Sequence, residues 1–211
     1  MTPKLLTEFI GTFFLVLTVG LTVLNGTPFA PLAIGSSLMI MVYMGGHISG
    51  GHYNPAVSLG VFLRGKLDGK SLVSYWMVQL AGAIAASLIV LMVMGPGFAV
   101  TPSTNHPLYH AIVIEFLFTF ALVLVVLNSA TASGTAGNSF YGLAIGFTVV
   151  VGAFAGGPIS GAINPAVGLG PTIVNAALEG GSLSQSWIYF VGPMLGGWAA
   201  ATVFKIQNPG D

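Results

Sequence analysis

The amino-acid sequence predicts an all-α membrane protein, in which six transmembrane helices and two half-helices form one bundle with an inverted repeat. Three observations predict this fold class. The 211 residues are 55% hydrophobic and only 5% charged, with a mean hydropathy of +0.92, whereas a soluble domain carries about 25% charged residues. The apolar residues gather in long runs. The tripeptide Asn-Pro-Ala occurs twice between those runs, as Asn54, Pro55 and Ala56 and as Asn164, Pro165 and Ala166.

The apolar runs give the spans. A membrane-spanning helix needs about 20 mostly apolar residues. The six candidates are Leu5–Leu24, Pro31–Met44, Leu72–Met94, Tyr109–Leu127, Phe140–Phe154 and Gln185–Phe204. The second and fifth are short but can extend into weakly polar flanks. The first begins almost at Met1 without a small-residue cleavage site, so we interpret it as a retained span rather than a signal peptide.

Each Asn-Pro-Ala tripeptide precedes an apolar piece that is too short to span, Val57–Leu63 in one half and Val167–Ala177 in the other. These pieces are predicted to be half-helices. Each half of the chain therefore contains three spans and one half-helix. We expect a single transmembrane channel domain, residues 1–211, with repeat one at 1–95 and repeat two at 108–206.

The basic residues predict the orientation. If the chain crosses the membrane six times, all the basic residues lie on one side of the membrane. The positive-inside rule makes that side cytoplasmic, and both termini lie there too. Because each half has an odd number of spans, the second half must be inverted relative to the first. The basic residues are Lys4, Arg64, Lys66, Lys70 and Lys205.

Composition also limits the function. Five basic and five acidic residues balance, so net charge gives no indication of a nucleic-acid partner. The absence of cysteine excludes disulfides, thiolate metal sites and cysteine nucleophiles. The sequence contains no evident nucleophile–base pair or metal-ligand cluster. We therefore expect no enzyme activity, no cofactor and no metal.

The repeated tripeptide has a physical meaning. Asn is a strong N-cap and Pro suits the first helical position, so each copy starts a helix. Non-helical backbone at membrane depth is tolerated only where it is buried in protein or lines a water-filled cavity. Inverted symmetry brings the two helix N-termini together near the midplane, where their positive dipole ends repel cations and accept neutral polar solutes. Each carboxamide can cap its helix through oxygen and donate from nitrogen into the lumen.

With its two Asn-Pro-Ala tripeptides and the residues around them, the chain resembles the aquaporin (major intrinsic protein) family over essentially its full length, and we expect a bacterial member. The resemblance implies an aquaporin-like bundle with one pore per subunit, a homotetramer in the lipid bilayer of the plasma (inner) membrane, and passive passage of water and small uncharged solutes. The residues that carry it are 8–13 (Glu-Phe-Ile-Gly-Thr-Phe), 46–57 (Gly-His-Ile-Ser-Gly-Gly-His-Tyr-Asn-Pro-Ala-Val) and 157–166 (Gly-Pro-Ile-Ser-Gly-Ala-Ile-Asn-Pro-Ala).

The resemblance also gives roles to three polar residues. Glu8 and Glu115 each open an apolar run, and in the family such residues accept hydrogen bonds from the loops that carry Asn-Pro-Ala. The alternative is a pair of interfacial glutamates near the membrane surface. His52, two residues before Asn54, is expected on the cytoplasmic side of the pore loop.

One departure from the family concerns the constriction, or selectivity filter. Family members usually carry an Arg three residues after the second Asn; here that position is Val167, and Arg64, the chain's one arginine, lies in a predicted cytoplasmic connector. Counting from the two asparagines gives Ile34, Gly152 and Gly161 for the other positions. The second loop is one residue shorter than usual, so Ala153 and Ala162 are alternates for the last two.

All these filter side chains are small or aliphatic, whereas water-selective members tend to carry an aromatic, a His and the Arg. The throat should therefore be wider and less polar, which makes glycerol, urea, ammonia, peroxide, metalloid acids and small protonated organic acids candidate solutes beside water. Some plant vacuolar members with Val at the Arg position conduct water and ammonia. As an alternative, an aromatic from elsewhere, Phe154 or Tyr109, could refill the gap.

Two other functions are considered. Inverted repeats with broken helices also build secondary transporters, and these need an ionisable coupling site, for which Glu8 and Glu115 are the intramembrane candidates. A non-conducting structural membrane protein is the other alternative. Conductance, and its dependence on pH and sodium, would separate the three.

Overall fold

The computed structural model describes residues 2–211. In that range the chain forms α-helices, one π-helical turn (Leu127–Thr131) and one 3-10 turn (Ser133–Thr135), and it has no β-strand. The eight α-helices are α1 (Pro3–Leu24), α2 (Ala30–Ser49), α3 (Pro55–Leu63), α4 (Gly69–Met94), α5 (Leu108–Val126), α6 (Tyr141–Ala155), α7 (Pro165–Glu179) and α8 (Ile188–Gln207).

The six long helices correspond to the six predicted spans, and α3 and α7 correspond to the predicted half-helices. Within the described residues, four segments are long and apolar enough to cross a membrane: α1, α2, α4 and the continuous stretch Leu108–Thr131. At 15 residues α6 is shorter. Most predicted bounds shift by a few residues: for example, α2 continues to Ser49, where Gly50 in the left-handed region ends it, and α7 reaches Glu179 despite Pro171 in its interior.

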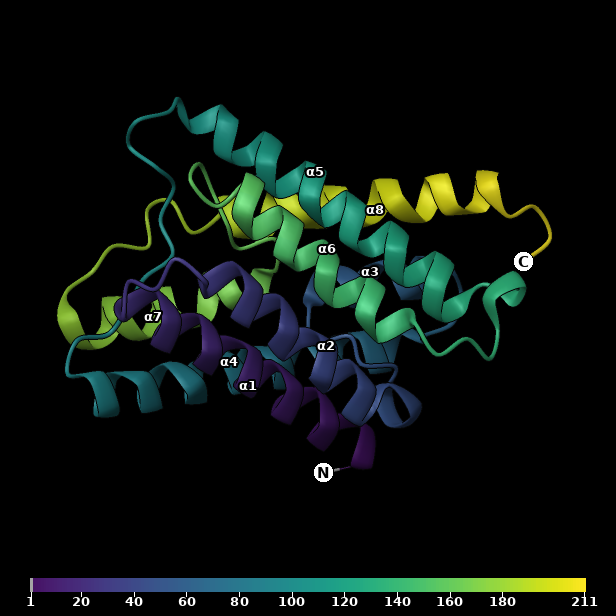
Figure 1. Cartoon of the computed structure of the whole chain (residues 1–211), viewed down its shortest axis with the longest axis horizontal. Helices are drawn as coiled ribbons and strands as arrows, with labels where there is room; N and C mark the ends of the chain where they lie inside the picture. Colours follow the sequence, from purple (N-terminus) through teal and green to yellow (C-terminus); the bar gives the residue numbers. More distant parts are fainter. Residues whose placement is uncertain (1) are drawn as a thin grey trace.

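The helices pack in matched pairs, one pair from each half of the chain. In the first half α1 packs against α4 and α2, and in the second half α5 packs against α8 and α6. The two halves meet where α2 packs against α6. Figure 1 shows α1, α2 and α4 grouped on one side and α5, α6 and α8 on the other. The same order of helix contacts therefore recurs in the two halves of the chain.

The half-helices are exchanged between the halves. The principal contact of α3 is with α8, and that of α7 is with α4. Glycine allows this close approach: a Cβ on Gly197 of α8 would lie 2.7 Å from the carbonyl oxygen of Ala56. In Figure 1, α7 lies toward the left-hand end of the molecule and α3 toward the right. The two half-helices therefore enter the bundle from opposite ends.

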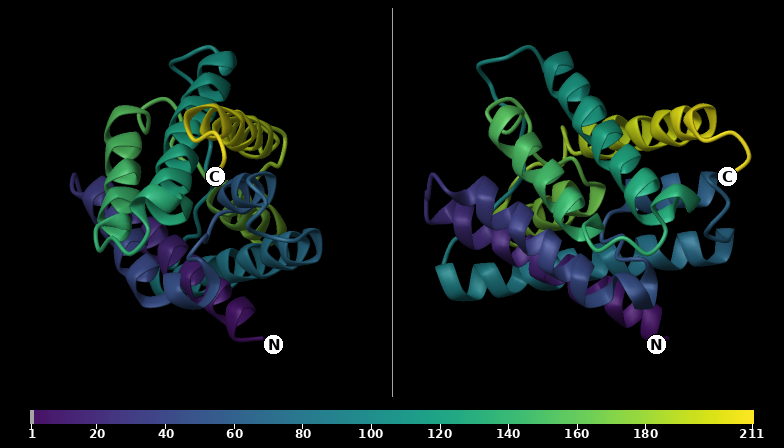
Figure 2. Two further views of the ribbon diagram at one scale, coloured as in Figure 1. Left: turned by 90° about the vertical axis from the view of Figure 1, so that its right-hand side faces the viewer. Right: turned by 45° about the vertical axis from the view of Figure 1, so that its right-hand side comes forward.

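Both termini lie toward one end of the molecule, and the connector between α4 and α5 (residues 95–107) lies toward the other, as the right panel of Figure 2 shows. The outer surface is apolar, with large exposed side chains such as Met77, Met92 and Ile206. Polar side chains gather inside instead: Glu8, Gln79 and Glu115 have no exposed surface. This distribution suits lipid outside and a polar centre.

Candidate functional site: the centre of the pore

Both half-helices begin at an asparagine whose side chain caps them. Asn54 and Asn164 have extended backbones, with φ of −155° and −161°. The Oδ1 of Asn54 accepts the backbone N–H of Ala56 at 2.8 Å, and that of Asn164 accepts Ala166 N–H at 2.9 Å. The proline that follows each asparagine occupies the first helical turn, where its missing N–H is no loss.

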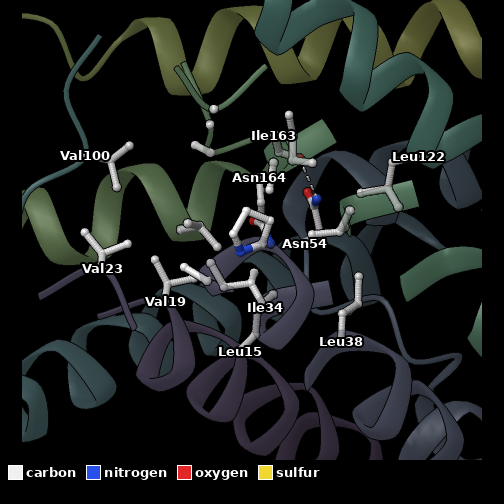
Figure 3. Close-up of a pocket in the computed structure, with 18 of the residues that line it drawn as sticks. Leu15, Val19, Val23, Ile34, Leu38, Asn54, Val100, Leu122, Ile163 and Asn164 are labelled. Atoms are coloured by element: carbon white, nitrogen blue, oxygen red, sulfur yellow. Dashed lines mark hydrogen bonds between the residues drawn. The ribbon is translucent and has the colours of Figure 1, made fainter. Parts of the chain in front are cut away.

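The two caps are bonded to each other's loops. Asn54 donates from Nδ2 to the carbonyl oxygen of Ile163 at 3.0 Å, and Asn164 donates from Nδ2 to that of Tyr53 at 2.9 Å. Figure 3 shows Asn54, Ile163 and Asn164 together at the centre of the cavity. Since a carboxamide has two N–H groups, each asparagine keeps one donor for the lumen. Each asparagine therefore uses one of its two N–H donors to hold the two loops together.

The residue before each asparagine has an unusual backbone. Tyr53 has φ of 48° and Ile163 has φ of 42°, a left-handed conformation that is uncommon for residues other than glycine. It costs on the order of 1–3 kcal/mol. The strain is offset by hydrogen bonds: the N–H of Tyr53 donates to Glu8 Oε2 at 2.7 Å, and that of Ile163 donates to Glu115 Oε2 at 2.6 Å.

Glu8 and Glu115 each hold one of the two loops that precede the half-helices by accepting hydrogen bonds from it. Glu8 accepts from Ser49 Oγ at 2.7 Å, His52 N–H at 2.9 Å, Tyr53 N–H and Gln79 Nε2 at 2.8 Å. Glu115 accepts from Ser160 Oγ at 2.7 Å, Ala162 N–H at 2.8 Å and Ile163 N–H. Both carboxylates are fully buried inside the protein, which favours the loop-supporting role over the interfacial alternative.

The first half has one further polar residue that the sequence did not single out. Gln79 of α4 donates to Glu8 and to Ser58 Oγ at 3.0 Å, and His52 Nδ1 lies 3.0 Å from the same Ser58 Oγ. A lone buried amide inside the apolar run of α4 was the signal that could have identified Gln79. In the second half, the buried hydroxyl of Tyr189 on α8 has no hydrogen-bond partner in residues 2–211.

A cavity of about 290 Å³, which we call the connector cavity, lies on the side of the α4–α5 connector. Both asparagines line it, together with mostly aliphatic side chains and no Lys, Arg, Asp or Glu. A second cavity of about 550 Å³, the terminal cavity, is lined by Lys4, Lys66 and residues of the α5–α6 connector. His52 lines both cavities. The two cavities therefore adjoin at His52.

The inferred filter residues lie as follows. Ile34, Gly161 and Val167 line the connector cavity, as does the alternate Ala162. In the fifth span it is the alternate Ala153 that lines this cavity, whereas Gly152 faces away: a Cβ on Gly152 would lie 3.1 Å from Ile163 Cδ1 and 3.3 Å from Phe118 Cδ1. Successive residues of a helix point about 100° apart, so Ala153 can line the cavity where Gly152 does not.

The missing arginine is not replaced by the expected aromatics. Tyr109 and Phe154 are 63% and 52% exposed on the outer surface, and neither lines the connector cavity. The aromatic ring that does so is Phe98, from the α4–α5 connector. Phe98 could not be predicted from the sequence, because a connector carries no periodic pattern that would place one of its residues in a pore.

Arg64 has a different role, at the end of α3. Its Nε donates to Thr131 Oγ1 at 2.9 Å, and its Nη2 donates to the carbonyl oxygen of Thr131 at 2.9 Å and to Asp211 Oδ1 at 2.7 Å. The guanidinium also lies 4.9 Å from the centre of the Phe204 ring. The arginine thus ties the half-helix to the α5–α6 connector and does not line the connector cavity.

Comparisons with known proteins agree with this geometry. Residues 1–204 match the model of the family described as major intrinsic protein. Aquaporin NIP1-4 of Oryza sativa subsp. japonica is 36% identical over 219 residues, which cover 98% of this chain and 78% of the rice protein. Nodulin-26 of Glycine max is 38% identical over 220 residues, which cover 99% of this chain and 79% of the soybean protein. These relatives are plant proteins, so the expected bacterial source is not borne out.

The fold also has a solved counterpart. The X-ray structure of the aquaglyceroporin from Plasmodium falciparum superimposes with a TM-score of 0.87 at 22% identity, covering 98% of this chain and 97% of that chain. At this identity the likeness speaks for the fold, and it confirms the predicted all-α membrane architecture. Family model, relatives and fold agree, and the chain therefore belongs to the major intrinsic protein family of integral membrane proteins.

Proposed function

We propose that this protein is a passive transmembrane channel for water and small uncharged solutes. The observation that carries the proposal is the meeting of two capped half-helix N-termini, whose asparagines Asn54 and Asn164 bond each other's loops and line the same cavity. The path runs from the terminal cavity past His52 to the connector cavity. Relatives named aquaporin support the assignment.

The electrostatics of this path favour neutral solutes. Both half-helices direct their positive dipole ends toward the asparagines, which disfavours cations and protons. The connector cavity offers no carboxylate or ammonium group that could replace the hydration shell of an ion. An uncharged solute needs only hydrogen-bond partners, which His52, Asn54, Asn164 and backbone groups can supply.

For the selectivity filter we propose Ile34, Ala153, Gly161 with Ala162, and Val167. The aliphatic lining and the position of Arg64 outside the connector cavity support a broad, weakly polar throat. Solutes of the size of glycerol or urea are then expected to pass together with water. Nothing in this arrangement calls for a cofactor or for enzyme chemistry.

A secondary transporter would need an ionisable residue that is free to couple an ion. Glu8 accepts four hydrogen bonds and Glu115 accepts three, most of them from the loop backbone. Protonating either carboxylate would leave buried donors competing for fewer acceptors. This engagement favours a structural role for both glutamates and a passive channel for the protein.

We also infer the setting of the channel. The positive-inside rule supports cytoplasmic termini, and for the membrane itself we propose the plasma (inner) membrane. Residues 1–95 and 108–206 are the two repeats of one channel domain, which the matched helix pairs support. Family membership supports a homotetramer with one pore in each subunit.

Stopped-flow measurements on proteoliposomes test the function. Water, glycerol, urea and ammonia are presented in turn, with protein-free liposomes as the control. We expect flux that is linear in the gradient and independent of sodium. Saturable, sodium- or pH-coupled flux would indicate a transporter instead, and a folded, reconstituted protein without any flux would indicate a structural protein.

A further inference from the structure

The connector between α4 and α5 supplies part of the pore wall. Four consecutive residues of it, Phe98, Ala99, Val100 and Thr101, line the connector cavity. Figure 3 shows Val100 and Val23 on the left-hand side of the view, opposite Leu122. None of the four belongs to the filter inferred from the sequence, which draws on helices and on the second pore loop alone.

Hydrogen bonds fix this segment to the second repeat. The N–H of Gly97 donates to both carboxylate oxygens of Glu179, at 3.0 and 3.1 Å, and the N–H of Val100 donates to Thr172 Oγ1 at 3.3 Å. Glu179 and Thr172 both belong to α7, the half-helix that carries Val167. Two residues beyond the cavity wall, the N–H of Ser103 donates to the carbonyl oxygen of Ile159 at 2.9 Å. The segment is therefore fixed relative to Val167, the filter position at which family members usually carry an arginine.

The other side of the segment is fixed to the first repeat. The Phe98 ring is 7% exposed and fits against α1, where a Cβ on Gly20 would lie 2.5 Å from its Cε1 atom. Glycine at position 20 thus creates the room for the ring. Phe98 thus packs against α1 and Val100 is bonded to α7, so the segment contacts both repeats where it lines the cavity.

We propose that Phe98–Thr101 is a specificity-determining element of the pore, in which the side chain of Val100 sets the cross-section of the mouth. The proposal rests on the channel function proposed above. The cavity contains no charged side chain that could select solutes by electrostatics. Discrimination among uncharged solutes therefore depends on the width of the cavity between its aliphatic walls. Small polyols would pass according to their cross-section and chain length.

The test compares Val100→Ala, which widens the mouth, with Val100→Leu, which narrows it. Stopped-flow swelling of proteoliposomes gives the flux of glycerol and of a four- or five-carbon polyol, each relative to water. Removing or adding a methyl group or two at a hydrophobic recognition site changes discrimination by roughly tenfold. We expect the polyol-to-water ratio to rise in Val100→Ala and to fall in Val100→Leu. Poor folding would lower all fluxes together and cannot move the ratio in opposite directions.

Two further variants sharpen the experiment. Val93→Ala makes the same change at the end of α4, on a side chain that is 61% exposed outside the cavity, and should leave the ratio unchanged. Thr172→Val removes the hydroxyl that holds Val100 and should raise the ratio as Val100→Ala does. A conducting wild type with the same ratio in all Val100 variants would overturn the inference alone. A wild type that conducts neither water nor solute would overturn the proposed function, and the inference with it.

Discussion

At the scale of single residues, the centre of the protein depends on two asparagines that each bond in two directions. The oxygen of Asn54 caps its own half-helix, while its nitrogen bonds the loop of the other repeat, and Asn164 does the same in reverse. No other residue of this size offers an acceptor and two donors on one planar group. The same side chains therefore start the half-helices, bond the two loops to each other and line the connector cavity.

Replacing Asn164 with Leu tests this double role. The change removes an N-cap, worth about 1 kcal/mol, and leaves the carbonyl oxygen of Tyr53 without its partner, which costs about 1–3 kcal/mol more. We expect a folded but less stable protein with strongly reduced water flux, measured by thermal unfolding in detergent and by stopped-flow. Asn105→Leu, at an exposed position of the α4–α5 connector, is the control. Wild-type flux in Asn164→Leu would mean that the pore lies elsewhere.

Val167 allows a second residue-scale test. Its side chain lines the connector cavity and is 5% exposed. Val167→Arg would introduce a long side chain with a positive charge and five N–H donors, in a cavity that faces water rather than lipid. We expect glycerol and urea flux to fall more than water flux. Val167→Leu adds bulk without charge and separates the two effects. An unchanged solute ratio in Val167→Arg would place the selective step at another point of the pore.

At the scale of elements, the half-helices are held chiefly by the opposite repeat. The helices α3 and α8, and likewise α7 and α4, can approach closely because glycines without a Cβ lie at the crossings. Gly197 of α8 contacts Ala56 of α3, and Gly170 of α7 contacts Ala83 of α4. Small residues permit such close approach within a membrane, where packing rather than the hydrophobic effect drives helix association. The half-helices are thereby fixed in place without spanning the bilayer.

Gly197→Val tests this crossing. The new Cβ would lie 2.7 Å from the carbonyl oxygen of Ala56, and overpacking of this kind typically costs about 1–3 kcal/mol. Helix propensity alone would favour the substitution slightly, because Val is a better helix former than Gly. A lower unfolding temperature in detergent would therefore report the contact. Gly134→Val, at a site with no atom within 4 Å of the new Cβ, should leave the temperature unchanged; a similar drop in both variants would contradict this interpretation.

At the scale of the whole molecule, charge and shape are arranged along one axis. The termini lie toward one end and the α4–α5 connector lies toward the other (Figure 2). Lys4 and Lys66 line the terminal cavity, and neither Lys nor Arg occurs in the connector 95–107. Because loops rich in Lys and Arg face the cytoplasm, such a molecule is expected to insert in one orientation.

Introduced cysteines test that orientation, since the chain has none of its own. Lys66→Cys should react with a membrane-impermeant maleimide only after the cells are opened, because position 66 is expected on the cytoplasmic side. Thr104→Cys, in the α4–α5 connector and exposed, should react in intact cells. The reverse pattern of labelling would show that the topology is inverted.

The sequence by itself determined the features that depend on local chemistry. Hydropathy and length give the spans, and the Asn-Pro pair gives the starts of α3 and α7, because a cap acts on its own first turn. Only the tertiary structure decided which side chains face the lumen. Counting residues gives a position along a helix axis, but each residue turns the helix by about 100°, so the choice between Gly152 and Ala153 depends on how α6 is seated. Likewise, Phe98–Thr101 line the cavity because Gly20, Thr172 and Glu179, all distant in the chain, hold the connector there.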